Sequence, residues 1–182
     1  MAYFARTFTV EDLKKVIEAV LFAAGRVVTL KDLKALFPEN DPEDIKEALR
    51  QLKKDYEKRG VVLKEVAGGF RLETLPEFAP YIQRIKQGAP PRLSRAALET
   101  LAVIAYKQPL TKAEIEVLRG VDSSGALKTL LEKGLIKIAG RKDVPGRPLL
   151  YATTSRFLEV FGLKDLSELP PLKEFEKLLE EK

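Results

Sequence analysis

The sequence contains no cysteine, no histidine and no tryptophan, and asparagine occurs only once. Without histidine or cysteine, nucleophilic mechanisms that use a Ser–His pair, a Cys–His pair or a thiolate are excluded. Zinc sites built from these two residue types are excluded as well, and disulfide bonds cannot form. The acidic residues are spread along predicted helices, which argues against a metal site made of carboxylates alone. The composition therefore limits the possible chemistry severely, although it leaves a carboxylate-only metal site open. We expect no catalytic residues, no bound metal and no cofactor.

Long apolar runs are also missing, and the longest ones fall far short of a membrane span. The first residues, Met1 to Arg6, lack the basic start and apolar core of a signal peptide, so we expect a cytoplasmic protein. The 182 residues are 45% hydrophobic and 32% charged, which is typical of a globular protein. The net charge of +5 divides into +2 for residues 1–88, +5 for 89–162 and −2 for 163–182.

Three helices and a hairpin are predicted in the first half of the chain. Residues 1–8 look irregular, and Thr9 then begins a helix that Gly25 ends. The same reasoning places the next helices after Thr29 and after Asp41, where Asp is the N-cap and Pro42 the first helical residue. Residues 61–66 and 70–75 alternate as strands around the turn at Gly68 and Gly69. A short helix over residues 76–86 follows.

The second half repeats this order. Leu98, Leu101, Ala102 and Ala105 recur at helical spacing and predict the first helix. Thr111 and Glu114 form a capping-box pattern that begins the second, which carries Ile115 and Leu118 inward and ends near Gly120. Asp122 and Ser123 are candidate N-caps of a third helix that ends near Gly134. Residues 135–138 and 149–151 are predicted strands around the long loop 140–148, and a last short helix follows.

Three helices followed by a hairpin is the order of a winged helix. A shift of 82 residues aligns the two halves, for example Phe22 with Ile104, Thr29 with Thr111 and Leu33 with Ile115. The sequence therefore predicts an α+β protein with two tandem winged-helix domains, at residues 1–88 and 89–165. Residues 87–91 form a proline-rich linker, and residues 166–182 form an acidic amphipathic tail with Leu172, Phe175, Leu178 and Leu179 at helical spacing.

Several segments of the second half go beyond this general order. They are Leu93–Leu101, Gln108–Ile115, Arg119–Val121, Gly140–Pro148 with Tyr151, Thr153 and Thr154, Phe161–Leu163, and Leu169–Leu172. Together they resemble the segregation and condensation protein B family, the accessory subunit of the bacterial structural-maintenance-of-chromosomes complex. The dense match covers about the C-terminal half, while the first half matches in layout. None of these motifs carries chemistry by itself.

The resemblance implies a function without catalysis. Members of this family are homodimers that bind a kleisin, segregation and condensation protein A, which bridges the ATPase heads of the complex. The resemblance therefore implies a role in chromosome condensation and partition at the nucleoid. We expect residues 1–88 to form the dimer, because their nearly balanced charge limits repulsion between copies. Residues 89–165 would bind the kleisin.

Apolar residues on more than one side of the first two helices of the second half suggest where that binding occurs. Such a surface can either pack on a neighbouring domain or bind a partner. The resemblance favours a partner, and the predicted partner-binding residues are Tyr106, Leu110, Val117 and Leu118.

The alternative function is a DNA-binding transcriptional regulator, because winged helices commonly bind DNA. Residues 123–133, the third helix of the second half, contain no Arg, Asn or Gln for bidentate base contacts. The loop 140–148 offers Arg141, Lys142 and Arg147 as possible phosphate contacts, which leaves weak, non-specific DNA contact open. The other interpretation of this loop is a rigid turn, with Arg141 or Arg147 paired to Asp143 and Gly146 at a backbone angle that other residues resist.

Overall fold

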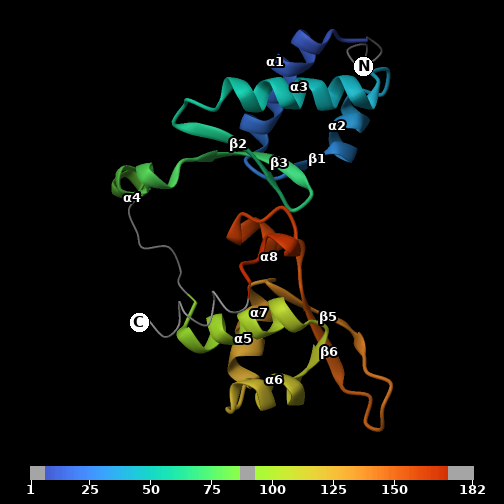
Figure 1. Ribbon diagram of the computed structural model, residues 1–182, viewed down its shortest axis with the longest axis vertical. Helices are drawn as coiled ribbons and strands as arrows, with labels where there is room; N and C mark the ends of the chain where they lie inside the picture. The colour runs from blue at the N-terminus through green and yellow to red at the C-terminus, as the bar shows by residue number, and fades with distance from the viewer. Residues whose placement is uncertain (1–6, 87–92, 172–182) are drawn as a thin grey trace. The chain divides into compact units, whose positions relative to one another are not determined.

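The structure is a computed structural model that describes residues 7–86 and 93–171. The chain divides into two compact units, Met1–Ala89 and Pro90–Lys182. Figure 1 colours both along the chain. The predicted linker at residues 87–91 and the four apolar residues of the predicted tail lie outside the described residues. Each unit combines helices with one small sheet, so the predicted α+β class is confirmed.

The first unit contains three helices, a three-stranded sheet and a terminal helix. Its elements are α1 (Val10–Ala24), β1 (Val28–Thr29), α2 (Leu30–Leu36), α3 (Pro42–Asp55), β2 (Val61–Val66), β3 (Gly69–Thr74), the 3₁₀ turn η1 (Pro76–Phe78) and α4 (Ala79–Lys86). The strand order is β1-β3-β2, and both pairings are antiparallel. Three helices followed by the β2–β3 hairpin match the predicted winged-helix order.

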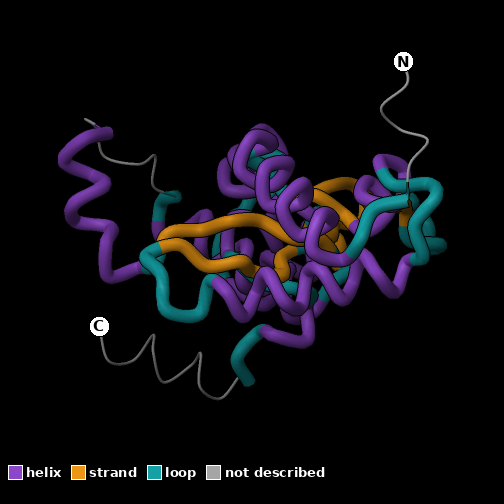
Figure 2. The backbone as a smooth tube through the Cα atoms, turned by 90° about the horizontal axis from the view of Figure 1, so that it is seen from above, coloured by secondary structure: helices purple, strands orange, loops and turns teal. Residues whose placement is uncertain are grey.

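The second unit repeats this arrangement. Its elements are α5 (Arg95–Lys107), β4 (Leu110–Thr111), α6 (Lys112–Arg119), α7 (Ser124–Glu132), β5 (Ile136–Arg141), β6 (Leu149–Thr153), α8 (Ser155–Phe161) and the 3₁₀ turn η2 (Leu166–Glu168). The strand order β4-β6-β5 is the same as in the first unit. Figure 2 distinguishes the strands from the helices that surround them.

Several helices begin where the sequence predicted, although α3 ends at Asp55, before the predicted end at Gly60. Thr9, Thr29 and Thr111 are N-caps whose side chains accept a hydrogen bond from the amide three residues on. Thr29 and Thr111 each form a complete capping box, with Asp32 and Glu114 respectively. These bonds satisfy amides that would otherwise lack a partner at the start of a helix, so they determine where each helix begins.

Each unit has its own hydrophobic core. In the first unit α1 contributes Leu13, Ile17 and Leu21, and α3 contributes Ile45, Leu49 and Leu52, all buried. In the second unit the buried residues are Ala97, Leu101, Ile104, Ala105, Ile115, Leu127, Leu130, Leu135, Ile136 and Phe157. The residues of each core come from a single unit, so each unit buries its apolar faces within itself.

The register of the repeat differs from the prediction in the first helix. The 82-residue shift aligns Phe22, which is 80% exposed, with Ile104, which is fully buried. A shift of 84 instead aligns the buried faces, for example Ile17 with Leu101. The shift of 82 holds for the capping boxes because, relative to that alignment, α5 ends one residue earlier than α1 and the connection to the second helix is one residue shorter. Leu98 was predicted as part of the apolar stripe of the first helix. It is 45% exposed, so it does not lie on the buried face of α5.

Two features were not predicted. The two-residue strands β1 and β4 add a third strand to each sheet. β1 runs so close to the hairpin that a Cβ on Gly69 would lie 2.7 Å from the Val28 carbonyl oxygen. Gly69 is therefore needed for this approach, whereas the turn itself lies at Ala67 and Gly68, one residue earlier than predicted. Phe8, in the segment predicted to be irregular, donates its amide to Asn40 Oδ1 at 3.1 Å and packs edge-on against Phe37.

Candidate functional site

The position of α6 determines which of the predicted partner-binding residues reach the surface. The capping box at Thr111 begins this helix, and Gly120, in the left-handed conformation, ends it. Ile115 is fully buried against the core of the second unit. On the same helix, Val117 lies opposite Ile115 and is 82% exposed, and Leu118, three residues on from Ile115, is 47% exposed. The prediction that Leu118 points inward is therefore wrong, whereas its place on an exposed apolar face agrees with the structure.

The other two predicted partner-binding residues lie differently. The Tyr106 side chain is half-buried, and its hydroxyl donates to the Pro170 carbonyl oxygen at 2.7 Å. Leu110 is half-buried in β4, where it pairs with Tyr151 of β6 and packs against the core. These two residues thus take part in the packing of their own unit. An Ala substitution at either would alter that packing as well as any partner contact.

Two exposed apolar residues near α6 were not predicted as part of the surface. Val121, just after α6, is 54% exposed, and Leu98 of α5 is 45% exposed. An ion pair of 3.1 Å between Arg119 Nη2 and Glu99 Oε2 joins the end of α6 to the first turns of α5. Leu98 and Leu118 each adjoin one member of this pair in the sequence. The cores of α5 and α6 do not include Leu98 and Leu118, and this could have indicated from the sequence that both are exposed.

A polar network holds the turn between α6 and α7. Arg119, whose side chain is only 6% exposed, donates through Nη1 to Ser123 Oγ at 3.0 Å. The Ser123 amide donates in turn to Glu116 Oε1 at 2.9 Å. Hydrogen bonds from Arg119 and Arg95 lower the pKa of Glu99 from its usual value. The Arg119 Nε atom is buried without a partner among the described residues. This network fixes the exposed face of α6 relative to α5.

The basic loop 140–148 contains a turn in which the Arg147 amide donates to the Val144 carbonyl oxygen at 2.8 Å, but its side-chain contacts differ from those predicted. Arg141 Nη1 donates to the Arg147 carbonyl oxygen at 3.0 Å, and Gly146 has a φ of +82°. Among the described residues, neither Arg141 nor Arg147 forms an ion pair with Asp143, so the predicted pairing is wrong. Lys142 instead forms an ion pair with Glu114, whose carboxylate completes the capping box of α6. Arg141 does not pair with Asp143 because its guanidinium reaches across the base of the loop to the Arg147 carbonyl oxygen.

This ion pair has an electrostatic consequence. The Lys142 ammonium, together with the Thr111 amide and hydroxyl, lowers the pKa of Glu114 to about 2. Of the three residues predicted as possible phosphate contacts, Lys142 is thus already engaged by a carboxylate. Arg141 and Arg147 have exposed side chains. Lys128, on the helix that a DNA-binding winged helix would insert into the major groove, is 79% exposed and lies 4.0 Å from Glu132.

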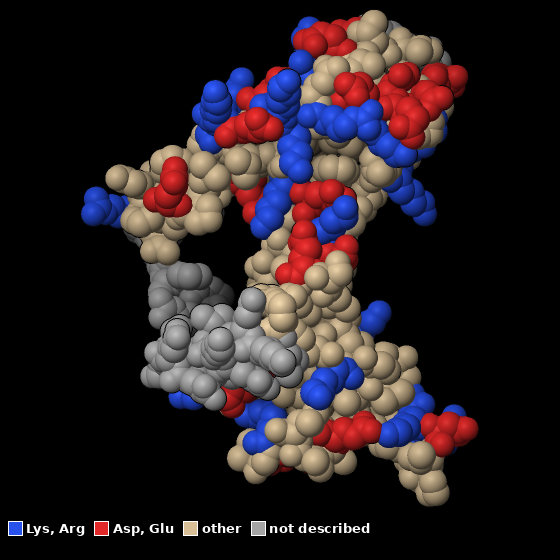
Figure 3. Space-filling model, in the orientation of Figure 1, with Lys and Arg blue, Asp and Glu red and all other residues tan. Residues whose placement is uncertain are grey.

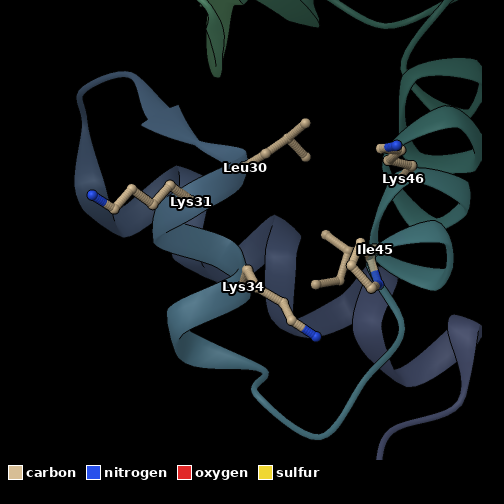
Figure 4. Close-up of a pocket in the computed structure, with 6 residues that line it drawn as sticks. Leu30, Lys31, Lys34, Ile45 and Lys46 are labelled. Atoms are coloured by element: carbon tan, nitrogen blue, oxygen red, sulfur yellow. The ribbon is translucent and has the colours of Figure 1, made fainter.

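The first unit has a hollow between α2 and α3. Its volume is about 210 Å³, and it is lined by Leu30, Lys31, Lys34, Pro42, Ile45 and Lys46. Leu30 and Ile45 point toward this space (Figure 4). Lys46 is paired with Glu43 at 2.6 Å, and Lys34 donates to the Asn40 carbonyl oxygen. Two of the three cations thus already have partners.

Charges of both signs are mixed over the helices of the first unit on the face that Figure 3 shows. Examples are the ion pairs Lys14–Asp55, at 3.1 Å between α1 and α3, and Arg50–Glu47, at 2.6 Å within α3. Such mixing weakens the electrostatic attraction of a phosphate backbone.

Two absences among residues 7–86 and 93–171 bear on the class of site. This part of the chain has no group of three or more acidic side chains placed to hold a metal ion. None of its helices has both the length and the apolarity needed to cross a membrane.

Comparison with known proteins gives consistent matches. The family model for "Segregation and condensation complex subunit ScpB" matches residues 15–172. Segregation and condensation protein B of Syntrophotalea carbinolica is 54% identical over 172 residues, which cover 93% of this chain and 87% of that protein. The protein of the same name from Moorella thermoacetica is 48% identical, with coverage of 92% and 86%.

Solved structures are similar in sequence as well. The crystal structure of ScpB from Mycobacterium tuberculosis is 36% identical, with a TM-score of 0.40, and the match covers 86% of this chain and 98% of that one. A crystal structure described as a dimer of the ScpB N-terminal domain complexed with ScpA peptide is 34% identical, with a TM-score of 0.38. That match covers 42% of this chain and 96% of the solved one.

Proposed function

Because the chain belongs to the segregation and condensation complex subunit ScpB family, we propose that it is a non-enzymatic accessory subunit of a bacterial condensin-like complex. It acts as a homodimer that binds the kleisin subunit and supports chromosome condensation and segregation. It works in the cytoplasm, at the nucleoid. In this proposal residues 1–88 form the dimer and residues 89–165 bind the kleisin.

The observation that carries this proposal is the extent of the family match. Residues 15–172 include α1 at one end and η2 at the other, so the match covers the cores of both units. Relatives about half identical to this chain, over roughly nine-tenths of its length, carry the same name. The function proposed is therefore that of a two-unit protein and does not rest on a single winged helix.

The exposed face of α6 supports the location of kleisin binding. Val117 and Leu118 are apolar, exposed and adjacent, on a helix whose orientation the Arg119 network fixes. Exposed apolar surface of this kind usually marks a protein partner. A segment that covered Val117 and Leu118 would bury them without disturbing the core, which Ile115 faces.

The test is titration of the kleisin's central segment into the protein by calorimetry. Val117→Asp should weaken binding by about tenfold or more, because the new carboxylate would be buried without a partner in the complex. Val160→Asp is the matched control, since Val160 is 59% exposed on α8 and lies outside the proposed surface. Unchanged affinity in Val117→Asp would remove the α6 face from the proposal but leave kleisin binding elsewhere intact.

A random-sequence DNA duplex titrated in parallel separates this function from a DNA-binding regulator. Apolar docking should survive moderate salt and show a negative heat-capacity change. DNA binding should weaken steeply with salt, because each neutralised phosphate releases counterions. The regulator would replace the proposed function if the protein failed to bind the kleisin segment and bound DNA tightly and with sequence preference.

A further inference from the structure

The last helix of the first unit is attached to its body at one end only. The Leu75 amide donates to the Gly60 carbonyl oxygen at 3.2 Å, and Phe78 packs over Gly60, where an added Cβ would lie 3.2 Å from the Phe78 ring. Beyond this anchor, α4 packs mainly against η1. Within the first unit, Figures 1 and 2 both show α4 standing apart from α1, α2 and α3.

The outward face of α4 is apolar. Tyr81 is 67% exposed and Ile85 is 84% exposed, and the two lie one helical turn apart on the same side of the helix. Ile82 and Ala79 of the same helix are half-buried. Burying a large aromatic and a branched aliphatic side chain is strongly favourable. An exposed stripe of this composition indicates a surface that is covered in the working protein.

Two charges of opposite sign lie along this segment, one before and one after Tyr81, so two antiparallel copies could pair them. Glu77 in η1 and Arg84 in α4 are both exposed, four residues before and three residues after Tyr81. Among the described residues, neither has a hydrogen bond or an ion pair. The η1–α4 segment thus carries a negative charge before Tyr81 and a positive charge after it.

We propose that α4 packs antiparallel against α4 of a second copy of this chain, around a two-fold axis beside Tyr81. A two-fold contact uses the same patch on both copies, so the patch must be complementary to itself. In the antiparallel arrangement Glu77 of one copy lies level with Arg84 of the second copy, and the reverse, which gives two ion pairs. Tyr81 of both copies packs at the axis, and Ile85 of each copy packs beyond Arg84, against the start of η1 of the second copy. This inference rests on the proposed homodimer and assigns residues to its interface.

The test is the molar mass of the full chain, measured by light scattering and sedimentation over a range of concentrations. Tyr81→Glu and Ile85→Glu should each raise the dimer dissociation constant by about tenfold or more, because burying an unpaired carboxylate is unfavourable. Phe22→Glu, an equally exposed apolar site on α1, should leave the dissociation constant unchanged. Circular dichroism melts check that each variant is folded.

Charge reversal tests the register and does not depend on apolar packing. Glu77→Arg alone and Arg84→Glu alone should each weaken the dimer by about tenfold, since each places like charges opposite one another in both symmetric pairs. The double variant should recover most of that loss. A wild-type dimer that none of these substitutions weakens would overturn the α4 interface while the homodimer stands. A wild-type monomer at micromolar concentration would overturn both, and kleisin titration reports separately on partner binding.

Discussion

At the scale of single residues, the two capping boxes do the same work in the two units. Thr29 with Asp32 and Thr111 with Glu114 begin the second helix of each unit, 82 residues apart. In both cases the hydroxyl accepts from the amide three residues on, and the carboxylate accepts from the threonine amide. Their effect on stability should therefore be similar.

We predict that Thr29→Ala and Thr111→Ala each destabilise their own unit by about 1 kcal/mol, the usual cost of losing an N-cap. Hydrogen exchange measured by mass spectrometry separates the two units and should show faster exchange only in the unit that carries the change. Thr29→Ser and Thr111→Ser, which keep the hydroxyl, are the controls. Equal loss in the Ser and Ala variants would indicate that the methyl group, and not the cap, matters.

Glu114 makes the second unit sensitive to acid. Its pKa is lowered from 4.5 to about 2, first by Lys142 and then by the Thr111 amide and hydroxyl. A lowered pKa means that the ionised form stabilises the fold above about pH 4.5 and that this contribution is lost as the pH falls toward 2. We predict that Glu114→Gln is less stable than the wild type at pH 7, and that the difference narrows between pH 4.5 and 2.

Urea unfolding at several pH values measures this difference. Glu39→Gln, at an exposed carboxylate that has no ion pair among the described residues, is the control and should show no such narrowing. A gap between Glu114→Gln and the wild type that stayed constant from pH 7 to pH 2 would contradict the role assigned to the Glu114 charge.

At the scale of elements, the Lys142–Glu114 pair ties the β5–β6 hairpin to α6. We predict that Lys142→Gln raises the pKa of Glu114 but leaves it below 4.5, because the Thr111 amide and hydroxyl still donate to the carboxylate. A nuclear magnetic resonance titration of the Glu114 side chain measures this change. Lys137→Gln, on an exposed residue of β5, should leave the titration unchanged. An unaltered Glu114 pKa in Lys142→Gln would mean that the cap alone lowers it.

The first helices of the two units show how an element can be recognised and yet be placed in the wrong register. Both α1 and α5 were predicted from their apolar spacing, but the shift of 82 paired exposed Phe22 with buried Ile104. Helical spacing shows that one face is apolar. It does not show which of several apolar residues faces the core when they cover more than half of the helix, as in α5.

At the scale of the whole molecule, the two units are built as separate bodies with separate cores. We predict that residues 1–88 and 89–182, produced separately, each fold. Their summed circular dichroism should reproduce that of the full chain, because neither core uses residues of the other unit. Light scattering should find residues 1–88 dimeric and residues 89–182 monomeric at micromolar concentration. An unfolded fragment would contradict the first part, and a monomeric 1–88 would contradict the place given to the dimer.

The sequence by itself determined what depends on near neighbours along the chain. The threonine caps, the glycine at the end of α6 and the β2 strand were all found from residues within about four positions of one another. Hydrogen bonds at helix ends and the alternation of a strand have this short range, so composition and spacing are enough to find them. The order of these elements then led to the fold class.

Only the tertiary structure decided what depends on distant partners. The strands β1 and β4 have two residues each, too few to show alternation, and they exist because they pair with β3 and β6. Tyr106 is held by Pro170, 64 positions away, while Val117 is exposed because none of the described residues of its unit covers it. Whether an apolar residue belongs to the core or to a docking surface is settled by which elements pack against its face, and spacing along one helix carries no information about that packing.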